Sequence, residues 1–238
     1  MEIPLFLNEE YAKRGIPKYV QWNPAKAAHF VVYGTTGSGK TVATKLIMAR
    51  IAKYIPDSQI WLSDYKGDSD FGFLNGGERF FRYNETLEGL RGFYTEFRKR
   101  QSGESSERNL IMLCIDEWAS FLMGLDKKTV EEAKNIMGTI LMMGRSFNVH
   151  ILLSMQRVDS TYFSASSRDQ ANVVIGLGNL SSEGKEMMFR EFKDKMKSDR
   201  KQSTGYMITN GAEFTAIQVP YISDMNKMNH YIKQAVNR

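Results

Sequence analysis

Gly34-Thr35-Thr36-Gly37-Ser38-Gly39-Lys40-Thr41 matches the phosphate-loop pattern G-x-x-x-x-G-K-[ST]. A short β-branched run at residues 29–33 precedes it, and residues 40–54 after it place apolar side chains at helical spacing. In this strand–loop–helix context the glycines let backbone N–H groups turn inward around a polyphosphate, and the helix adds its positive N-terminus. Residues 34–41 are therefore expected to bind ATP, with Lys40 on the β- and γ-phosphates and the Thr41 hydroxyl on Mg²⁺.

A pair of carboxylates, Asp116-Glu117, follows the uninterrupted apolar run at residues 110–115. Such a run is typical of a central strand in a parallel sheet, so we expect Asp116 at the tip of that strand, holding Mg²⁺ through water. Glu117 is then placed to polarise the attacking water, because phosphoryl transfer needs mainly positioning and charge stabilisation. An acidic pair after a core strand is also a common surface feature, and the upstream phosphate loop is what favours the catalytic interpretation.

Two further residues are candidates for contact with the terminal phosphate. Residues 150–155 form the next predicted strand and deliver Gln156 at its tip, where a glutamine can touch the γ-phosphate or the lytic water. Gln156 is equally interpretable as the polar start of a loop. Arg145 lies near the end of a long predicted helix, residues 127–147, where the helix dipole favours a cation. The alternative for Arg145 is an arginine finger that reaches the ATP of a neighbouring subunit.

Strands that alternate with helices predict an α/β fold with a mainly parallel sheet covered on both faces. Near the C-terminus, Asn210-Gly211 between two apolar runs predicts a β-hairpin. Three prolines in the first 28 residues favour an irregular segment there. The expected organisation is an N-terminal arm at residues 1–28, a motor domain at residues 29–222 and a C-terminal tail at residues 223–238.

Composition limits the class and location of the protein. A chain of 238 residues suits one α/β domain, and 42% hydrophobic with 25% charged residues is ordinary globular composition. The net charge of +5 is compatible with a polyanionic partner but does not indicate one. Cys114 is the single cysteine, so a reducing, cytoplasmic location fits best. No apolar run approaches the roughly 20 residues that span a membrane, so any membrane association is expected through a partner.

Five motifs, by their order and spacing, resemble the FtsK/SpoIIIE branch of the FtsK–HerA superfamily. They are residues 28–41, 64–67, 114–117, 144–157 and 168–178. The last resembles the version in coupling ATPases of Gram-positive conjugative elements, for which a membrane or relaxosome partner is expected. The resemblance implies a RecA-like core of the ASCE type, a homohexameric ring, and ATP-driven movement of DNA, double-stranded DNA being favoured, through the pore. Small packaging ATPases of some viruses have a similar minimal build.

Several positions depart from the family pattern. Tyr65, Met155 and Val158 stand where the family usually has Pro, Thr and Pro. Asn148 replaces a usual glycine, which the tolerance of Asn for the left-handed conformation accommodates. FtsK-like proteins also carry a membrane domain, a second motor subdomain and a winged helix. The segments on either side of the core are too short for these, so a stripped motor or a fragment is expected.

The resemblance leaves more than one candidate for the arginine finger. The family often has an arginine, one candidate for a finger in trans, where Val174 stands. Its replacement shifts the expectation to Arg145, with Arg168 and Arg157 as further candidates.

Two cation clusters are candidate DNA contacts, and each has a simpler interpretation. Residues 185–201 mix seven cations with four acids, which predicts a mixed-charge amphipathic surface helix, and residues 98–100 read Arg-Lys-Arg. Either could supply sequence-independent affinity for phosphates. Two functions remain open: a DNA translocase that acts in transfer, segregation or packaging, and a nucleotide-controlled assembly or recruitment ATPase that acts on a protein partner or secretion substrate.

Overall fold

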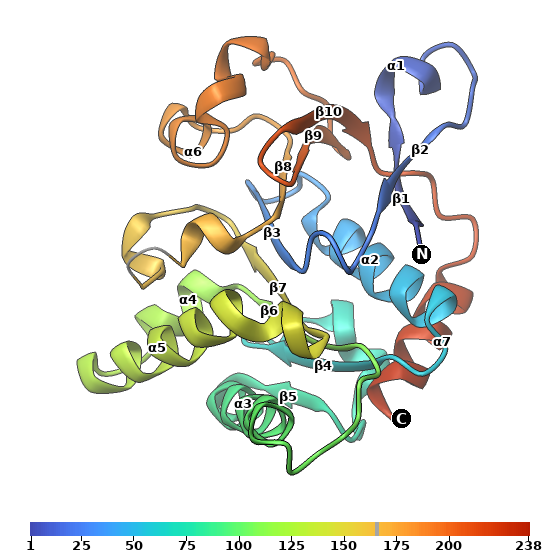
Figure 1. The fold of residues 1–238 in the computed structure, drawn as a ribbon. Helices are drawn as coiled ribbons and strands as arrows, with labels where there is room; N and C mark the ends of the chain where they lie inside the picture. The colour runs from blue at the N-terminus through green and yellow to red at the C-terminus, as the bar shows by residue number, and fades with distance from the viewer. Residues whose placement is uncertain (165–166) are drawn as a thin grey trace.

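One ten-stranded mixed sheet runs through the computed structural model of the chain, which describes residues 1–164 and 167–238 (Figure 1). Six neighbouring strands are parallel, and four antiparallel strands extend the sheet on one side. The parallel strands are β3 (His29–Gly34), β4 (Gln59–Asp64), β5 (Phe80–Arg82), β6 (Ile111–Asp116), β7 (Val149–Met155) and β8 (Val173–Leu177); the others are β1 (Ile3–Asn8), β2 (Tyr19–Trp22), β9 (Thr204–Thr209) and β10 (Glu213–Gln218). Their order is β2-β1-β10-β9-β8-β3-β7-β6-β4-β5.

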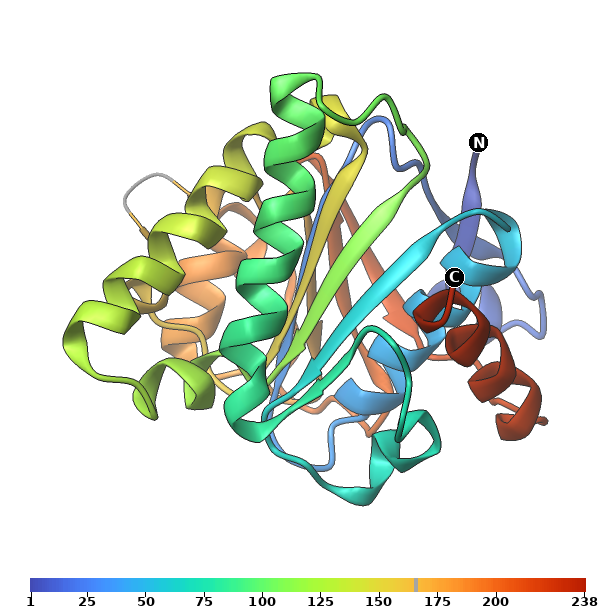
Figure 2. The same cartoon turned by 90° about the horizontal axis from the view of Figure 1, so that it is seen from below.

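Helices cover both faces of the sheet, so that the molecule has three layers (Figure 2). One face carries α2 (Lys40–Tyr54) and α7 (Met225–Val236); the other carries α3 (Thr86–Ser102), α4 (Trp118–Met123), α5 (Lys127–Met143) and α6 (Ser182–Met188). Shorter pieces are α1 (Glu9–Ala12) and the 3₁₀ segments η1 (Ser69–Leu74), η2 (Tyr83–Glu85), η3 (Gly144–Phe147), η4 (Ser160–Tyr162), η5 (Arg168–Gln170) and η6 (Arg190–Lys195). Within the described ranges no helix combines the length and apolarity needed to cross a bilayer.

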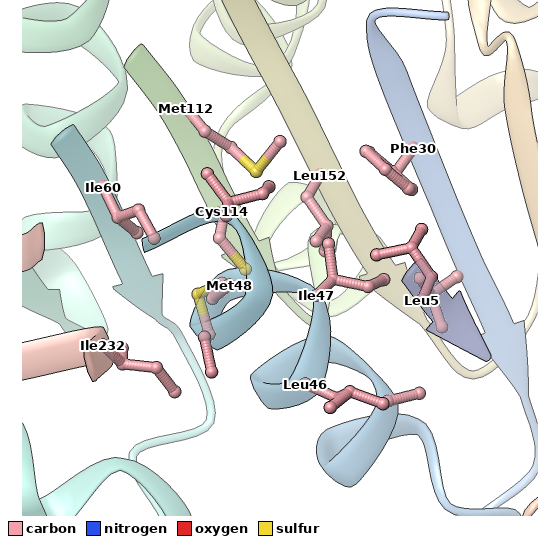
Figure 3. Close-up of a cluster of buried hydrophobic side chains, with 14 of the residues drawn as sticks. Leu5, Phe30, Leu46, Ile47, Met48, Ile60, Met112, Cys114, Leu152 and Ile232 are labelled. Carbon is pink, nitrogen blue, oxygen red and sulfur yellow. The ribbon is translucent and has the colours of Figure 1, made fainter. Parts of the chain in front are cut away.

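Alternate residues of the parallel strands feed two separate cores, one on each face of the sheet. On the α2 side, Ile47 and Met48 pack among Phe30, Cys114 and Leu152 from three different strands (Figure 3). On the other side, Leu113 and Leu153 belong to a second buried cluster with α3, α4 and α5. Burial on both faces is the reason these strands are apolar without interruption.

The predicted α/β fold with a mainly parallel sheet and a C-terminal hairpin is confirmed. The predicted helix over residues 40–54 is α2. The hairpin β9–β10 turns at Asn210 and Gly211, whose φ angles are 55° and 71°, and Asn148 takes the left-handed conformation expected for it, with φ 57°. β7 lies between β3 and β6, so one strand separates the phosphate-loop strand from the acid strand, as the ASCE type requires.

The expectation of an irregular arm at residues 1–28 is wrong. β1 and β2 form an antiparallel hairpin, and β1 joins the sheet beside β10, with Leu7 opposite Gln218. Ile3 and Leu5 are fully buried. Pro4 lies within β1 next to a register shift in its pairing with β2, where a missing N–H disturbs the sheet least. The alternating apolar residues of this short strand are buried despite the proline between them.

Two other expected segments also differ. Residues 223–238, expected as a tail, contain α7, which packs against α2 and β4 and buries Ile232 and Val236. The single helix expected over residues 185–201 is broken into α6 and η6. The apolar side chains of this stretch pack on the sheet from both pieces, and the break at Phe189 lets that ring reach Tyr33 and Phe214.

A buried ion pair fastens the N-terminal hairpin to the rest of the sheet. Arg200, one of the seven cations of the 185–201 cluster, lies with its Nη1 2.8 Å from Glu9 Oε2. Its Nη2 donates to the carbonyl oxygens of Gly205 at 3.0 Å and Ile217 at 3.4 Å. Arg200 therefore joins α1 to β9 and β10 and is withdrawn from the surface.

Replacing Arg200 should destabilise the protein more than replacing the exposed partner of the same carboxylate. Arg200→Met leaves Glu9 as a buried charge without its main partner, so the free energy of unfolding should fall by about 3 kcal/mol. The matched control is Lys13→Ala, whose side chain is 63% exposed and lies 3.0 Å from Glu9; it should cost less than about 1 kcal/mol. Urea unfolding measures both, and equal losses would contradict the role of the buried pair.

Candidate nucleotide site

The phosphate loop joins β3 to α2 at the edge where the parallel strands end (Figure 1). Gly37 and Gly39 have φ angles of 77° and 99°, a region that glycine enters without steric cost. Gly34 is needed for a different reason, because a Cβ there would overlap the carbonyl oxygen of Leu177. The loop backbone is thus open at Gly37, where a Cβ would meet nothing within 4 Å, and closely packed at Gly34.

Residues distant in sequence brace the loop from behind. The Ser203 N–H donates to the Ser38 carbonyl at 2.9 Å, and Ser203 itself is left-handed, with φ 61°. Gly178, at the end of β8, lies against the Ser38 side chain. Nothing in the local sequence around Ser203 signals this contact, since it follows from the position of β8 and β9 beside β3.

Lys40 and the acid pair belong to one site. The Lys40 side chain is nearly buried and its Nζ lies 3.4 Å from the carbonyl oxygen of Thr35. Burial lowers the pKa of Lys40, the negative charges of Glu117 and Asp116 raise it in part, and the net pKa stays below its ordinary value. The sheet order explains the proximity, because only β7 separates the strands that end in Gly34 and Asp116.

Asp116 and Glu117 are each 6% exposed at the tip of β6. Glu117 begins α4 in the left-handed conformation, with φ 61° and ψ 52°. A non-glycine residue held in this region stores roughly 1–3 kcal/mol of strain, which persists where the surroundings impose it and is frequent at functional sites. The turn at Glu117 is therefore a structural mark of the site that the sequence pattern does not contain.

The carboxylates fit a bound Mg²⁺. The pKa of Asp116 is raised to about 7, mainly by burial and also by the charges of Glu117 and Asp64, while the charge of Lys40 acts in the opposite direction. A divalent cation would relieve this excess of negative charge, and oxygen ligands are those that Mg²⁺ prefers. Asp116, with the Thr41 hydroxyl in the first turn of α2, would hold the ion. The open glycine loop and Lys40 would hold the polyphosphate.

Gln156 is brought to the phosphate loop as expected. It follows β7, whose last residue Met155 pairs with Tyr33 just before the loop. The Thr36 hydroxyl lies 3.4 Å from Gln156 Oε1. The side chain thus stands between the phosphate loop and the strand of the acid pair, where a γ-phosphate or an attacking water would lie.

Arg145 lies at the opposite end of the parallel strands from the phosphate loop, near the point where β7 begins. It belongs to η3, just before β7 begins, and its Nη1 donates to the Lys26 carbonyl at 3.4 Å. The seven residues of β7 span about 23 Å, so Arg145 cannot reach the phosphate loop of its own chain. It lines a hollow together with Lys26 and Arg108. Arg157 lies at the phosphate-loop edge, next to Gln156, and the side chain of Arg168 lies outside the described residues.

Both predicted cation clusters lose members to structural contacts. Besides Arg200, Arg100 is buried and donates to the carbonyl oxygens of Asn109 at 2.7 Å and Phe147 at 3.1 Å. Lys193 pairs with Glu186 at 2.6 Å. A guanidinium that ties two loops to a helix cannot also contact DNA phosphates, so neither cluster acts as an intact basic patch.

Comparisons with known proteins show the family of the chain. A family model described as "Helicase HerA, central domain" matches residues 9–135, more than half of the chain. The FtsK domain-containing protein YdcQ of Bacillus subtilis (strain 168) is 23% identical over 218 residues, covering 84% of this chain and 45% of the relative. The chain thus spans less than half the length of that protein.

Two solved structures share the fold. The conjugation coupling protein TcpA of pCW3, in its monomer form with ATPγS, matches with a TM-score of 0.73 at 20% identity, over 91% of this chain and 67% of TcpA. The cytoplasmic domain of the type VII secretion ATPase EccC from Thermomonospora curvata matches with a TM-score of 0.71 at 17% identity, over 98% of this chain and 31% of EccC. The α/β P-loop ATPase fold is therefore shown.

Removing the buried carboxylate should change how stability depends on pH when metal and nucleotide are absent. Because the pKa of Asp116 is raised from 3.8 to about 7, its contribution to stability is fully present below the unfolded pKa and is lost as the pH rises through 7. Relative to Asp116→Asn, the wild type should lose about 1.4 kcal/mol of unfolding free energy per pH unit between pH 5 and pH 7. Chemical denaturation in EDTA measures this, and a constant difference across the range would contradict it.

Proposed function

Because the chain belongs to the family of the HerA helicase central domain, we propose that it is an ATP-hydrolysing motor that moves DNA and works as a ring. The observation that carries hydrolysis is the meeting of the phosphate loop, the Asp116-Glu117 pair and Gln156 at one edge of the sheet. These are the parts that phosphoryl transfer to water requires from a single chain, apart from a cation for the charge that develops on the transferring phosphate.

Each residue of the site has a separate task in this proposal. Lys40 and the loop N–H groups bind and orient the polyphosphate, and Asp116 with Thr41 fixes the position of the metal. When bound, Mg²⁺ neutralises charge on the phosphate oxygens. Glu117 orients the attacking water and accepts its proton, and Gln156 reports on the terminal phosphate through its contact with Thr36. The strained, left-handed turn at Glu117 allows the two carboxylates to have different roles although they are adjacent in sequence.

DNA as the moved polymer is supported by family membership and by the similarity to a conjugation protein. HerA is described as a helicase, and TcpA is a conjugation coupling protein. The net charge of +5 is compatible with a polyanion, and double-stranded DNA is the substrate we favour. Conjugative transfer, with a membrane or relaxosome partner, is the process that best matches TcpA.

A ring is supported by the position of Arg145. An arginine at the edge remote from its own phosphate loop is free to face a neighbouring copy in a head-to-tail arrangement, in which the same two surfaces meet at every interface. We propose a hexamer in which each ATP lies between subunits and Arg145 completes the site of its neighbour, where it would stabilise charge on the transferring phosphate.

The second candidate function, action on a protein partner, is favoured by a hollow of about 750 Å³ over β8. Its floor is apolar and includes Val174, Phe189 and Ile208. Among the described side chains, the rim carries five carboxylates and one guanidinium, although the molecule as a whole is basic. These properties fit a basic amphipathic segment, and EccC, which shares the fold, is a secretion ATPase. A nucleotide-controlled recruitment ATPase would use this hollow.

DNA should stimulate ATP hydrolysis if the first function is correct. ATPase rates with double-stranded, single-stranded and no DNA measure this, and the stimulation should weaken steeply with added salt because phosphate contacts are ionic.

Lys40→Ala should abolish tight ATP binding, whereas Glu117→Gln should retain binding and lose hydrolysis. Glu131→Gln, at an exposed acid on α5, is the matched control. An ATPase rate that is the same with and without DNA but rises when a basic peptide is added would favour the second function.

Mixing inactive variants should restore activity if Arg145 works in trans. Arg145→Ala and Glu117→Gln subunits should each be inactive alone, but in a mixture some interfaces pair an intact Glu117 site with an intact Arg145. Hydrolysis should therefore reappear and rise with protein concentration, because association depends on mass action. Arg108→Ala, from the same hollow, should keep most of its activity. Mixtures that co-assemble on DNA without regaining hydrolysis would assign Arg145 another role.

A further inference from the structure

The turn after β4 emerges beside the acid pair. β4 and β6 are parallel neighbours, and Asp64, the last residue of β4, stands directly opposite Asp116. Asp64 is fully buried, and its charge is among those that raise the pKa of Asp116. Residues 65–68 therefore begin at the same sheet edge as Asp116 and Glu117.

Several contacts hold the backbone of this turn in place. The Gly67 N–H donates to Asp64 Oδ1 at 2.8 Å, and Gly67 is left-handed, with φ 65°. Its carbonyl accepts a hydrogen bond from the Tyr83 hydroxyl at 3.0 Å and another from the Arg82 guanidinium. A Cβ at Gly67 would overlap the Tyr83 ring. Any other residue at position 67 would displace the Tyr83 ring or the turn itself.

The other side of the turn is attached to the helix that carries Glu117. The Tyr65 ring stands edge-on to Phe121 of α4, with centroids 5.7 Å apart. The Tyr65 hydroxyl lies against Gly124, at the end of that helix. Because α4 starts directly after Glu117, one short helix sets the position of both the acid and the turn.

Lys66 is the residue of this turn whose side chain can change its ion-pair partner. It is 53% exposed and its Nζ lies 2.8 Å from Asp68 Oδ2. The hydrogen bond to Asp68 contributes most to raising the pKa of Lys66, and the charges of Asp116 and Glu117 raise it further. An exposed pair of this kind contributes little to stability. A stronger anion at the neighbouring site can therefore replace Asp68 as its partner.

We propose that Lys66 is a cation of the ATP site supplied by the same chain, which leaves Asp68 for the terminal phosphate when ATP binds. This inference rests on the proposed ATPase function. In hydrolysis the water oxygen bonds to the γ-phosphorus, the bond to the β–γ bridging oxygen breaks with its electron pair on ADP, and the water proton passes to Glu117. Lys66 makes and breaks no covalent bond. Its ammonium stabilises charge on the γ-phosphate oxygens, which increases in the transition state.

The test compares Lys66→Ala with Asp68→Asn, which removes the resting partner and keeps the lysine. Lys66→Ala should lower kcat by roughly 10²-fold or more and weaken ATPγS binding by about tenfold, while ADP binding stays within about twofold, since ADP has no γ-phosphate. Asp68→Asn should keep kcat at or above the wild-type value. Lys66→Arg, which retains the charge, should recover part of the loss. Stopped-flow nucleotide binding and steady-state hydrolysis provide the readouts.

The outcomes separate this inference from the proposed function. If the Lys66–Asp68 pair only holds the turn, both variants should lose the same activity and should affect ATPγS and ADP equally, which would overturn the inference. Wild-type kcat and ATPγS affinity in Lys66→Ala would overturn it as well. A wild-type protein that binds ATPγS but hydrolyses no ATP would contradict the ATPase function instead. The ratio of ATPγS to ADP affinity would still show whether Lys66 contacts the γ-phosphate.

Discussion

Parallel pairing of β7 with both β3 and β6 is the constraint on which the site depends. Strands that run in the same direction end at the same edge, so the phosphate loop, Gln156 and the acid pair meet although more than 110 residues separate the first from the last. Parallel strands must also be covered on both faces. The two helical layers therefore serve the site indirectly, because the sheet order could not persist without them.

The electrostatics of the edge follow from this convergence. Three carboxylates, Asp64, Asp116 and Glu117, are buried close to one another, with Lys40 and Lys66 within reach of their charges. Burying like charges together is unfavourable unless cations accompany them. In the proposed function this cost is useful, since a divalent cation and a polyphosphate complete the balance of charge.

The antiparallel half of the sheet has a different role. β9 and β10 carry the brace at Ser203 to the phosphate loop, and β1 adds a further strand fastened by Glu9 and Arg200. A displacement of these strands would therefore reach the loop backbone through Ser38. The proline-containing N-terminal segment is thereby connected to the phosphate loop: it pairs with β10, and the residue that precedes β9, Ser203, contacts Ser38.

What could be predicted from sequence was local. The glycines of the phosphate loop, the left-handed Asn148 and the Asn210-Gly211 turn each depend on the backbone preferences of one or two residues, and the strands and α2 depend on short-range periodicity. These features suffice to place the phosphate loop, Asp116 and Gln156 at strand ends. Other features depend on partners far along the chain, which no local pattern encodes. Folding buried Arg100 and Arg200, placed Arg145 at the far edge, turned Glu117 into a strained conformation and set Lys66 beside the acids. A cation in sequence is only a charge, and the neighbours that the fold gives it determine whether it holds the protein together or remains free for a ligand.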